Sequence, residues 1–119
     1  MDFKKVHSDD RRTIYADSEL LGGKEISFIK LNKGKSIGGC MHANEEYCLL
    51  LEGDAEIFLG NHGIPMQRHK IYYLPSGLPH GFVGTTDCLI TEYGISSLEK
   101  EGNTKDEELS KIIAEINGS

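Results

Sequence analysis

Short apolar runs separated by turn-forming residues occupy most of the chain. Runs rich in Ile, Phe, Tyr and Leu recur from Arg12 to Tyr93, with Gly, Pro and Asn between them. β-Branched and aromatic side chains in runs this short favour strands over helices. The polar segment 1–11 is expected to form an arm or a first edge element. The pattern predicts strands at 12–16, 25–31, 45–51, 55–59, 64–66, 70–74, 82–83 and 88–93.

The run 45–51 is apolar on both faces of the strand that it predicts. Side chains alternate along a strand, so Cys48 and Leu50 share a face with Glu46, which we expect to be the interior. A strand that is apolar on both faces is normally covered on both. We therefore expect something to pack on the outer face. The side chains of that face are Tyr47, Leu49 and Leu51.

A helical pattern follows residue 96. Thr104 and Glu107 have the spacing of a capping box, whose hydroxyl and carboxylate bond free amides of the first turn. Gly118 suits a helix end. We predict a short amphipathic helix at about 104–117 that packs on the chain's own sheet. Its apolar stripe is Leu109, Ile112, Ile113 and Ile116.

Many short strands followed by one helix predict an all-β fold. The expected architecture is a small antiparallel β-barrel or jelly roll with a short C-terminal α-helix. At 119 residues the chain is expected to be one domain, 1–119, with a barrel core at about 12–95.

Composition and charge narrow the range of partners. The net charge is −6 and no basic stripe stands out, so we expect no nucleic-acid partner. The N-terminus lacks the apolar segment of a secretory signal, and the longest apolar run is too short to span a bilayer. Three cysteines without a framework spacing fit a reducing compartment, which predicts a cytoplasmic protein.

Four side chains in two stretches suggest a metal site. Cys40, His42 and Glu46 follow one another at intervals of two and four positions, so they can share one face of a strand if that strand is little broken. His80 follows a Pro-Gly turn and belongs to a second strand. One thiolate, two imidazoles and one carboxylate suit a divalent transition metal: zinc first, then iron(II), nickel or cobalt.

Simpler interpretations stay open for three of these residues. Cys40 can be a small buried apolar residue, and His42 and His80 can be hydrogen-bonded interior histidines that line a pocket. Glu46 is harder to explain in this way. A carboxylate on an apolar face needs an opposite charge, a metal or a raised pKa.

The spacing of these residues resembles the two motifs of the cupin superfamily. The first cupin motif is usually written G-x5-H-x-H-x3-4-E-x6-G, and the second G-x5-P-x-G-x2-H-x3-N. The resemblance implies a jelly-roll barrel and a metal site with positions open to water or substrate. It is carried by Gly34, Cys40, His42, Glu46, Gly53, Pro75, Gly77 and His80.

Three positions depart from the cupin motifs. Cys40 stands in place of the first histidine, which puts the identity of the metal in question. His69 stands in place of the second motif's glycine, and Gly84 in place of its asparagine. The last two positions belong to connecting structure.

The Gly-Gly-Cys-x-His form at 38–42 resembles small cupins of sugar and nucleotide-sugar metabolism. That resemblance implies an isomerase or epimerase, which must remove a proton beside a ketone. His80 is the candidate base if it does not bind metal, and His69 is the alternative. Tyr73 is the candidate proton donor, because it alternates in step with Ile71 and Pro75 and is therefore expected, rather than Tyr72, to face the cavity.

Two other functions stay open: a metal-dependent dioxygenase acting on a small acid or thiol, and a non-catalytic carbohydrate-binding protein. In each case the expected ligand is a small molecule. We also expect a homodimer, because one short helix can cover only part of the apolar surface that the sequence predicts.

Overall fold

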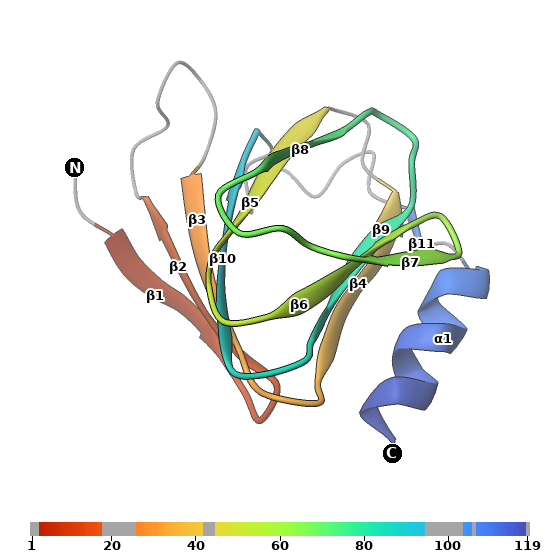
Figure 1. Ribbon diagram of the computed structural model, residues 1–119, viewed down its shortest axis with the longest axis horizontal. Coiled ribbons are helices and arrows are strands. Elements are labelled where there is room, and N and C mark those ends of the chain that lie inside the picture. The colour runs from red at the N-terminus through yellow and green to blue at the C-terminus, as the bar shows by residue number, and fades with distance from the viewer. Residues whose placement is uncertain (1–2, 18–25, 42–44, 95–103, 106, 119) are drawn as a thin grey trace.

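The computed structural model describes residues 3–17, 26–41, 45–94, 104–105 and 107–118, and Figure 1 shows their arrangement. The predicted strands are confirmed, and segment 1–11 contributes a first edge strand. Among the described residues, no helix is long and apolar enough to cross a membrane. The elements are β1 (Phe3–Ser8), β2 (Arg12–Asp17), β3 (Ile26–Leu31), β4 (Ser36–Met41), β5 (Glu46–Glu52), β6 (Ala55–Leu59), β7 (His62–Pro65), β8 (Ile71–Leu74), β9 (His80–Gly84), β10 (Cys88–Tyr93), β11 (Thr104–Lys105) and α1 (Glu107–Asn117).

The strands form two antiparallel sheets that pack face to face. One sheet has the order β1-β2-β3-β10-β5-β8, and the other has the order β11-β4-β9-β6-β7. Chain neighbours such as β4 and β5 lie in different sheets, so the chain crosses repeatedly between the two layers. The jelly-roll prediction, with a short C-terminal helix, is confirmed.

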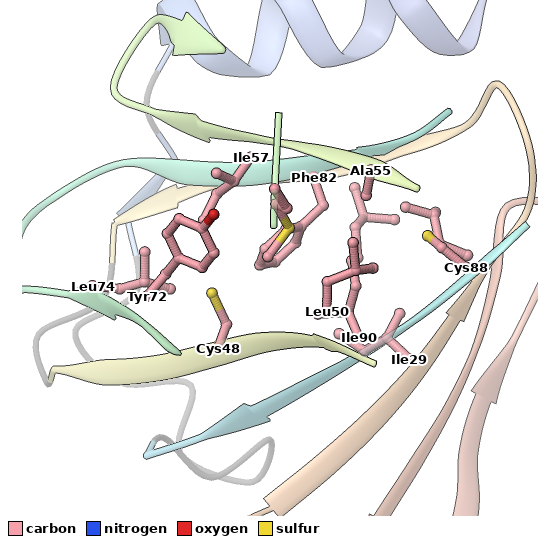
Figure 2. Packing of buried hydrophobic residues seen from close by; sticks show 13 residues of the cluster. Ile29, Cys48, Leu50, Ala55, Ile57, Tyr72, Leu74, Phe82, Cys88 and Ile90 are labelled. Atoms are coloured by element: carbon pink, nitrogen blue, oxygen red, sulfur yellow. The ribbon is translucent and has the colours of Figure 1, made fainter. Parts of the chain in front are cut away.

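The core lies between the two sheets. Figure 2 shows Leu50 and Ile90 from one sheet pointing toward Ile57 and Phe82 from the other. Each of these four side chains is at most 2% exposed. The alternation predicted for β5 is confirmed, because Glu46, Cys48 and Leu50 are buried while Tyr47 is exposed. The sequence pattern thus places one carboxylate in the interior at the start of β5.

Helix α1 packs on the chain's own sheet, as predicted; it lies on the outer face of β4 and β9 and buries Leu109 and Ile113. Its end is fixed to β4 by Asn117. The Asn117 side chain accepts a hydrogen bond from the amide of Ser36 at 2.7 Å and donates one to the carbonyl of Ser36 at 2.9 Å. The hydroxyl of Ser36 donates to the carbonyl of Ile113 at 3.0 Å.

The predicted start of the helix is wrong. The helix begins at Glu107, and Thr104 and Lys105 form strand β11 against Met41 and Cys40 of β4. An N-cap directly precedes the first helical residue, and Thr104 lies three residues before Glu107, so Thr104 is too early in the chain to cap the helix. The pairing extends the five-stranded sheet by one short edge strand.

The outer face of β5 and β8 remains exposed, because the helix lies on the other sheet. Ile71 is 66% exposed, Tyr73 50% and Tyr47 38%. The rings of Tyr47 and Tyr73 pair across the two strands, with centroids 5.4 Å apart. A groove of about 320 Å³ runs along this face. It is lined by Tyr47, Cys48, Leu49, Ile71, Thr91 and Tyr93.

Candidate metal centre

Glu46 is the carboxylate that the fold buries. It is the first residue of β5 and pairs with Leu74 of β8, and it is only 3% exposed. Its strand neighbours on the same face, Cys48 and Leu50, belong to the core. The prediction that Glu46 faces the interior is confirmed.

His80 is the first residue of β9 and is 5% exposed. Its Nε2 atom lies 3.6 Å from Oε1 of Glu46, so the structure brings together two of the four predicted ligands. Its Nδ1 atom lies 3.3 Å from the carbonyl oxygen of Leu78. A carbonyl oxygen only accepts hydrogen bonds, so Nδ1 carries the proton in this contact. In the neutral ring, Nε2 then presents its lone pair toward Glu46.

Glu92 is a third member of the cluster that the sequence analysis missed. It lies on β10, opposite Cys48 of β5, and its Oε2 atom is 4.0 Å from Nε2 of His80. One ligand atom each from Glu46, His80 and Glu92 lies within 4.8 Å of the other two. The alternation of β10 could have identified Glu92. Cys88 and Ile90 are buried, and Glu92 lies on the same face of the strand.

Burial and the neighbouring Glu92 alter the titration of Glu46. Burial raises the pKa of Glu46 to about 9, and the negative charge of Glu92 and a hydrogen bond with Glu92 add to the shift. Burial, followed by the charges of Glu92 and Glu46, also raises the pKa of Cys48. The Cys48 thiol therefore stays protonated near neutral pH, which fits a core residue rather than a metal ligand.

The other two predicted ligands are only partly placed. Cys40 lies on β4 directly opposite His80 of β9, but its side chain is outside the described part. His42 lies outside the described residues altogether. The pairing of β4 with β9 is irregular between Gly38 and Cys40, and Gly38 has a φ of 112°. A Cβ atom at Gly38 would lie 2.5 Å from the Cα of Gly81, so only glycine fits there.

Tyr73 does not face the interior, so this prediction is wrong. The pairing of Tyr73 with Tyr47 places it on the outer face, where its hydroxyl donates to the Glu45 carboxylate at 2.6 Å. This hydrogen bond raises the pKa of Tyr73. Tyr72 is the interior tyrosine, and its hydroxyl accepts a hydrogen bond from the amide of Gln67 at 2.9 Å. The prediction failed because it aligned Tyr73 with Ile71, which itself points outward.

His69, the alternative base, is exposed and has a φ of 68°. Its amide donates to the carbonyl of Leu50 at 2.9 Å. This left-handed conformation explains why the cupin motif carries glycine at the corresponding position.

No protein-family profile matches the chain, and no curated protein matches it in sequence. Its structure is similar to that of CapF, a capsular polysaccharide assembling protein from Staphylococcus aureus. The TM-score is 0.70 at 15% identity, and the match covers 90% of this chain and 32% of CapF. A cupin-2 domain from Rhodospirillum rubrum matches with a TM-score of 0.72 at 13% identity, over 94% of this chain and 79% of that domain.

A mutant of salicylate 1,2-dioxygenase from Pseudoaminobacter salicylatoxidans is also similar. Its TM-score is 0.68 at 10% identity, over 76% of this chain and 28% of the dioxygenase. The chain thus spans only 32% of CapF and 28% of the dioxygenase. Proteins of one fold carry different functions, so these similarities concern the architecture. With its two face-to-face sheets and its match to the cupin-2 domain, the chain has the cupin fold.

Proposed function

We propose that the chain is a metal-dependent isomerase or epimerase that acts on a sugar or a nucleotide sugar. The observation that carries the proposal is the approach of His80 to Glu46 in the interior, 3.6 Å between ligand atoms. Cys40 and His42 complete the proposed ligand set, and the register of β4 supports Cys40 by placing it opposite His80. The carbohydrate class is supported by CapF, which is described as a capsular polysaccharide assembling protein.

The geometry of the described residues fits a single ion. Ligand atoms that are each about 2.1 Å from one ion lie about 3 to 4.2 Å apart. The Nε2 atom of His80 is 3.6 Å from Oε1 of Glu46, which is within that range. The contact between Nδ1 of His80 and the Leu78 carbonyl orients the ring, as partners of metal-binding histidines commonly do.

A divalent ion bound here would polarise a substrate carbonyl and so acidify the adjacent C–H group. His80 would hold the ion through Nε2 while Nδ1 donates to Leu78. Both ring nitrogens are then engaged, so we assign His80 to metal binding rather than to proton abstraction. Tyr73 has no part in this proposal, because it lies on the opposite face of the sheet.

Solvent deuterium exchange tests the proposed reaction. The zinc-loaded protein is expected to exchange the proton beside the ketone of a keto-sugar or keto-sugar nucleotide in heavy water, observed by NMR. His80→Asn should abolish the exchange while the fold is retained. A native protein that binds metal but exchanges none of these sugars would refute the isomerase and leave the metal site standing.

The donor set also favours a second function, a metal-dependent dioxygenase acting on a small acid or thiol. Imidazole and carboxylate ligands with open positions are typical of non-haem iron(II) oxygenases. The similarity in fold to salicylate 1,2-dioxygenase supports this alternative. Oxygen uptake by the iron(II)-loaded protein with small acids or thiols would identify it. Tight carbohydrate binding without either reaction would indicate a binding protein instead.

We propose a second copy of the chain as the partner of the exposed face of β5 and β8. The helix covers only the other sheet, so Tyr47, Ile71 and Tyr73 remain in contact with solvent. The groove residues on this face are uncharged, and a two-fold axis would pair like apolar groups with each other. Such pairing needs no opposite charge, which suits a chain whose net charge is −6.

Ile71→Glu is expected to weaken this dimer at least tenfold, because it would bury a carboxylate in an apolar interface. Ile64→Glu is the matched control. Ile64 also lies on an edge strand and is 41% exposed, but it belongs to the other sheet. Sedimentation at low micromolar concentration measures the dissociation constant of each variant. A native protein that stays monomeric, or equal weakening by both substitutions, would contradict this interface.

A further inference from the structure

Glu92 lies beside the proposed metal ligands although neither cupin motif includes it. It comes from β10, whereas Glu46 comes from β5 and His80 from the facing sheet. The Glu92 side chain is 17% exposed, and its Oε2 atom is 4.0 Å from Nε2 of His80. The other inward positions of its strand, Cys88 and Ile90, are apolar and buried. The strand therefore directs the Glu92 side chain toward the interior, beside Glu46 and His80.

The charges of the cluster show what kind of partner it requires. Two carboxylates next to each other in a low-dielectric interior repel strongly. His80 carries at most one positive charge, so it can balance only one of them. The second must take up a proton or face another cation. A divalent ion would balance both and leave the imidazole neutral, the form in which it binds metals.

We propose that Glu92 is a direct ligand of the metal centre and that its carboxylate tunes the centre toward manganese(II) and iron(II). The proposal rests on the metal site of the proposed function and adds a residue to it. Oxygen donors favour the harder divalent ions, whereas thiolate and imidazole donors favour zinc. A ligand set with two carboxylates should therefore bind manganese(II) better than the set of Cys40, His42, Glu46 and His80 alone.

Manganese(II) titrations followed by electron paramagnetic resonance test this role, because the bound ion loses the sharp spectrum of the free ion. The native chain is expected to bind one manganese(II), and Glu92→Gln to weaken that binding at least tenfold. Zinc affinity should fall less, since the other ligands remain. Glu52→Gln is the control, because it removes an exposed carboxylate from the end of β5.

Glu92→Asp separates a direct ligand from a distant charge. The shorter side chain keeps the charge but draws the oxygens back, so a direct ligand predicts weaker manganese(II) binding. Manganese(II) affinity equal to the native value in both Glu92 variants would overturn the proposal and leave the metal site intact. A native chain that binds neither manganese(II) nor zinc would refute the metal site itself. Circular dichroism on each variant confirms that the fold is retained.

Discussion

Replacing His80 with Asn is expected to lower the affinity of the chain for zinc by about 100-fold or more. Loss of a residue that only supports a metal ligand typically costs 10- to 100-fold, and loss of a ligand should cost at least as much. His80 is 5% exposed, and its Nε2 atom lies 3.6 Å from Glu46 and 4.0 Å from Glu92, so the substitution removes the nitrogen donor that lies next to both carboxylates. Equilibrium dialysis with elemental analysis measures the affinity.

The same substitution should remove the thermal stabilisation that zinc gives. At a free zinc concentration of about 100 times the dissociation constant, binding adds about 2.7 kcal/mol to the native state. For a domain of this size that corresponds to roughly 10 °C in Tm. His80→Asn should show no such shift at the same zinc concentration.

His62→Asn is the control for surface binding of zinc by histidine. His62 begins β7 and is exposed, so its loss should leave both the affinity and the shift unchanged. If His80→Asn retained native affinity, the Glu46–His80 pair would be a buried hydrogen-bonded cluster and not a metal site.

The fold was predictable because most of the chain carries local signals that agree with one another. Short runs of apolar residues predict the strands, and glycine and proline between them predict the turns. Gly53, for example, has a φ of 77° in the two-residue turn between β5 and β6, although this turn joins the two sheets and does not form the hairpin that the sequence suggests. The start of the helix was predicted wrongly because the capping-box residue Thr104 is held by long-range pairing with Met41. Tertiary contacts override local propensity at such positions.

Site residues could be predicted only where they alternate in step with apolar residues that clearly belong to the core. Glu46 could be placed inward because Cys48 and Leu50 follow at the same parity, and the structure agrees. Tyr73 was placed wrongly because β8 is short and apolar on both faces, so its own sequence does not fix which face is buried. The pairing with β5 fixes it, and pairing partners are not visible in a single strand.

Glu92 was missed for a different reason. It lies 46 residues after Glu46 in the sequence, and the two meet only because β10 pairs with β5. No spacing rule links residues across that distance. The alternation of Cys88 and Ile90 places Glu92 on the inner face of β10. It does not predict which residues of other strands Glu92 meets there.

Glu46→Gln is expected to have opposite effects on metal binding and on the stability of the metal-free protein. The raised pKa of Glu46, about 9 in the folded chain against 4.5 as its ordinary value, means that the folded state holds a proton that the unfolded state releases. Stability from this group is fully present below pH 4.5 and is lost as the pH rises toward 9. The loss approaches about 1.4 kcal/mol per pH unit within that window.

Glutamine mimics the protonated carboxyl group and does not titrate. Between pH 6 and pH 8 the free energy of unfolding of the native protein should therefore fall by about 2 to 3 kcal/mol more than that of Glu46→Gln. Urea unfolding in the presence of a chelator, at several pH values, measures this difference. Glu52→Gln, at an exposed position of the same strand, controls for the change in net charge.

With zinc present, the native chain should be more stable than Glu46→Gln. Glutamine is a weaker ligand than a carboxylate, so Glu46→Gln should lose the zinc-dependent stabilisation that the native chain gains. A stability difference that does not change with pH in the metal-free protein would show that Glu46 is ionised in the folded state near neutral pH. A group other than the added metal would then balance its charge, and the raised pKa of Glu46 would be refuted, whereas Glu46→Gln that kept the zinc-dependent stabilisation would refute Glu46 as a ligand.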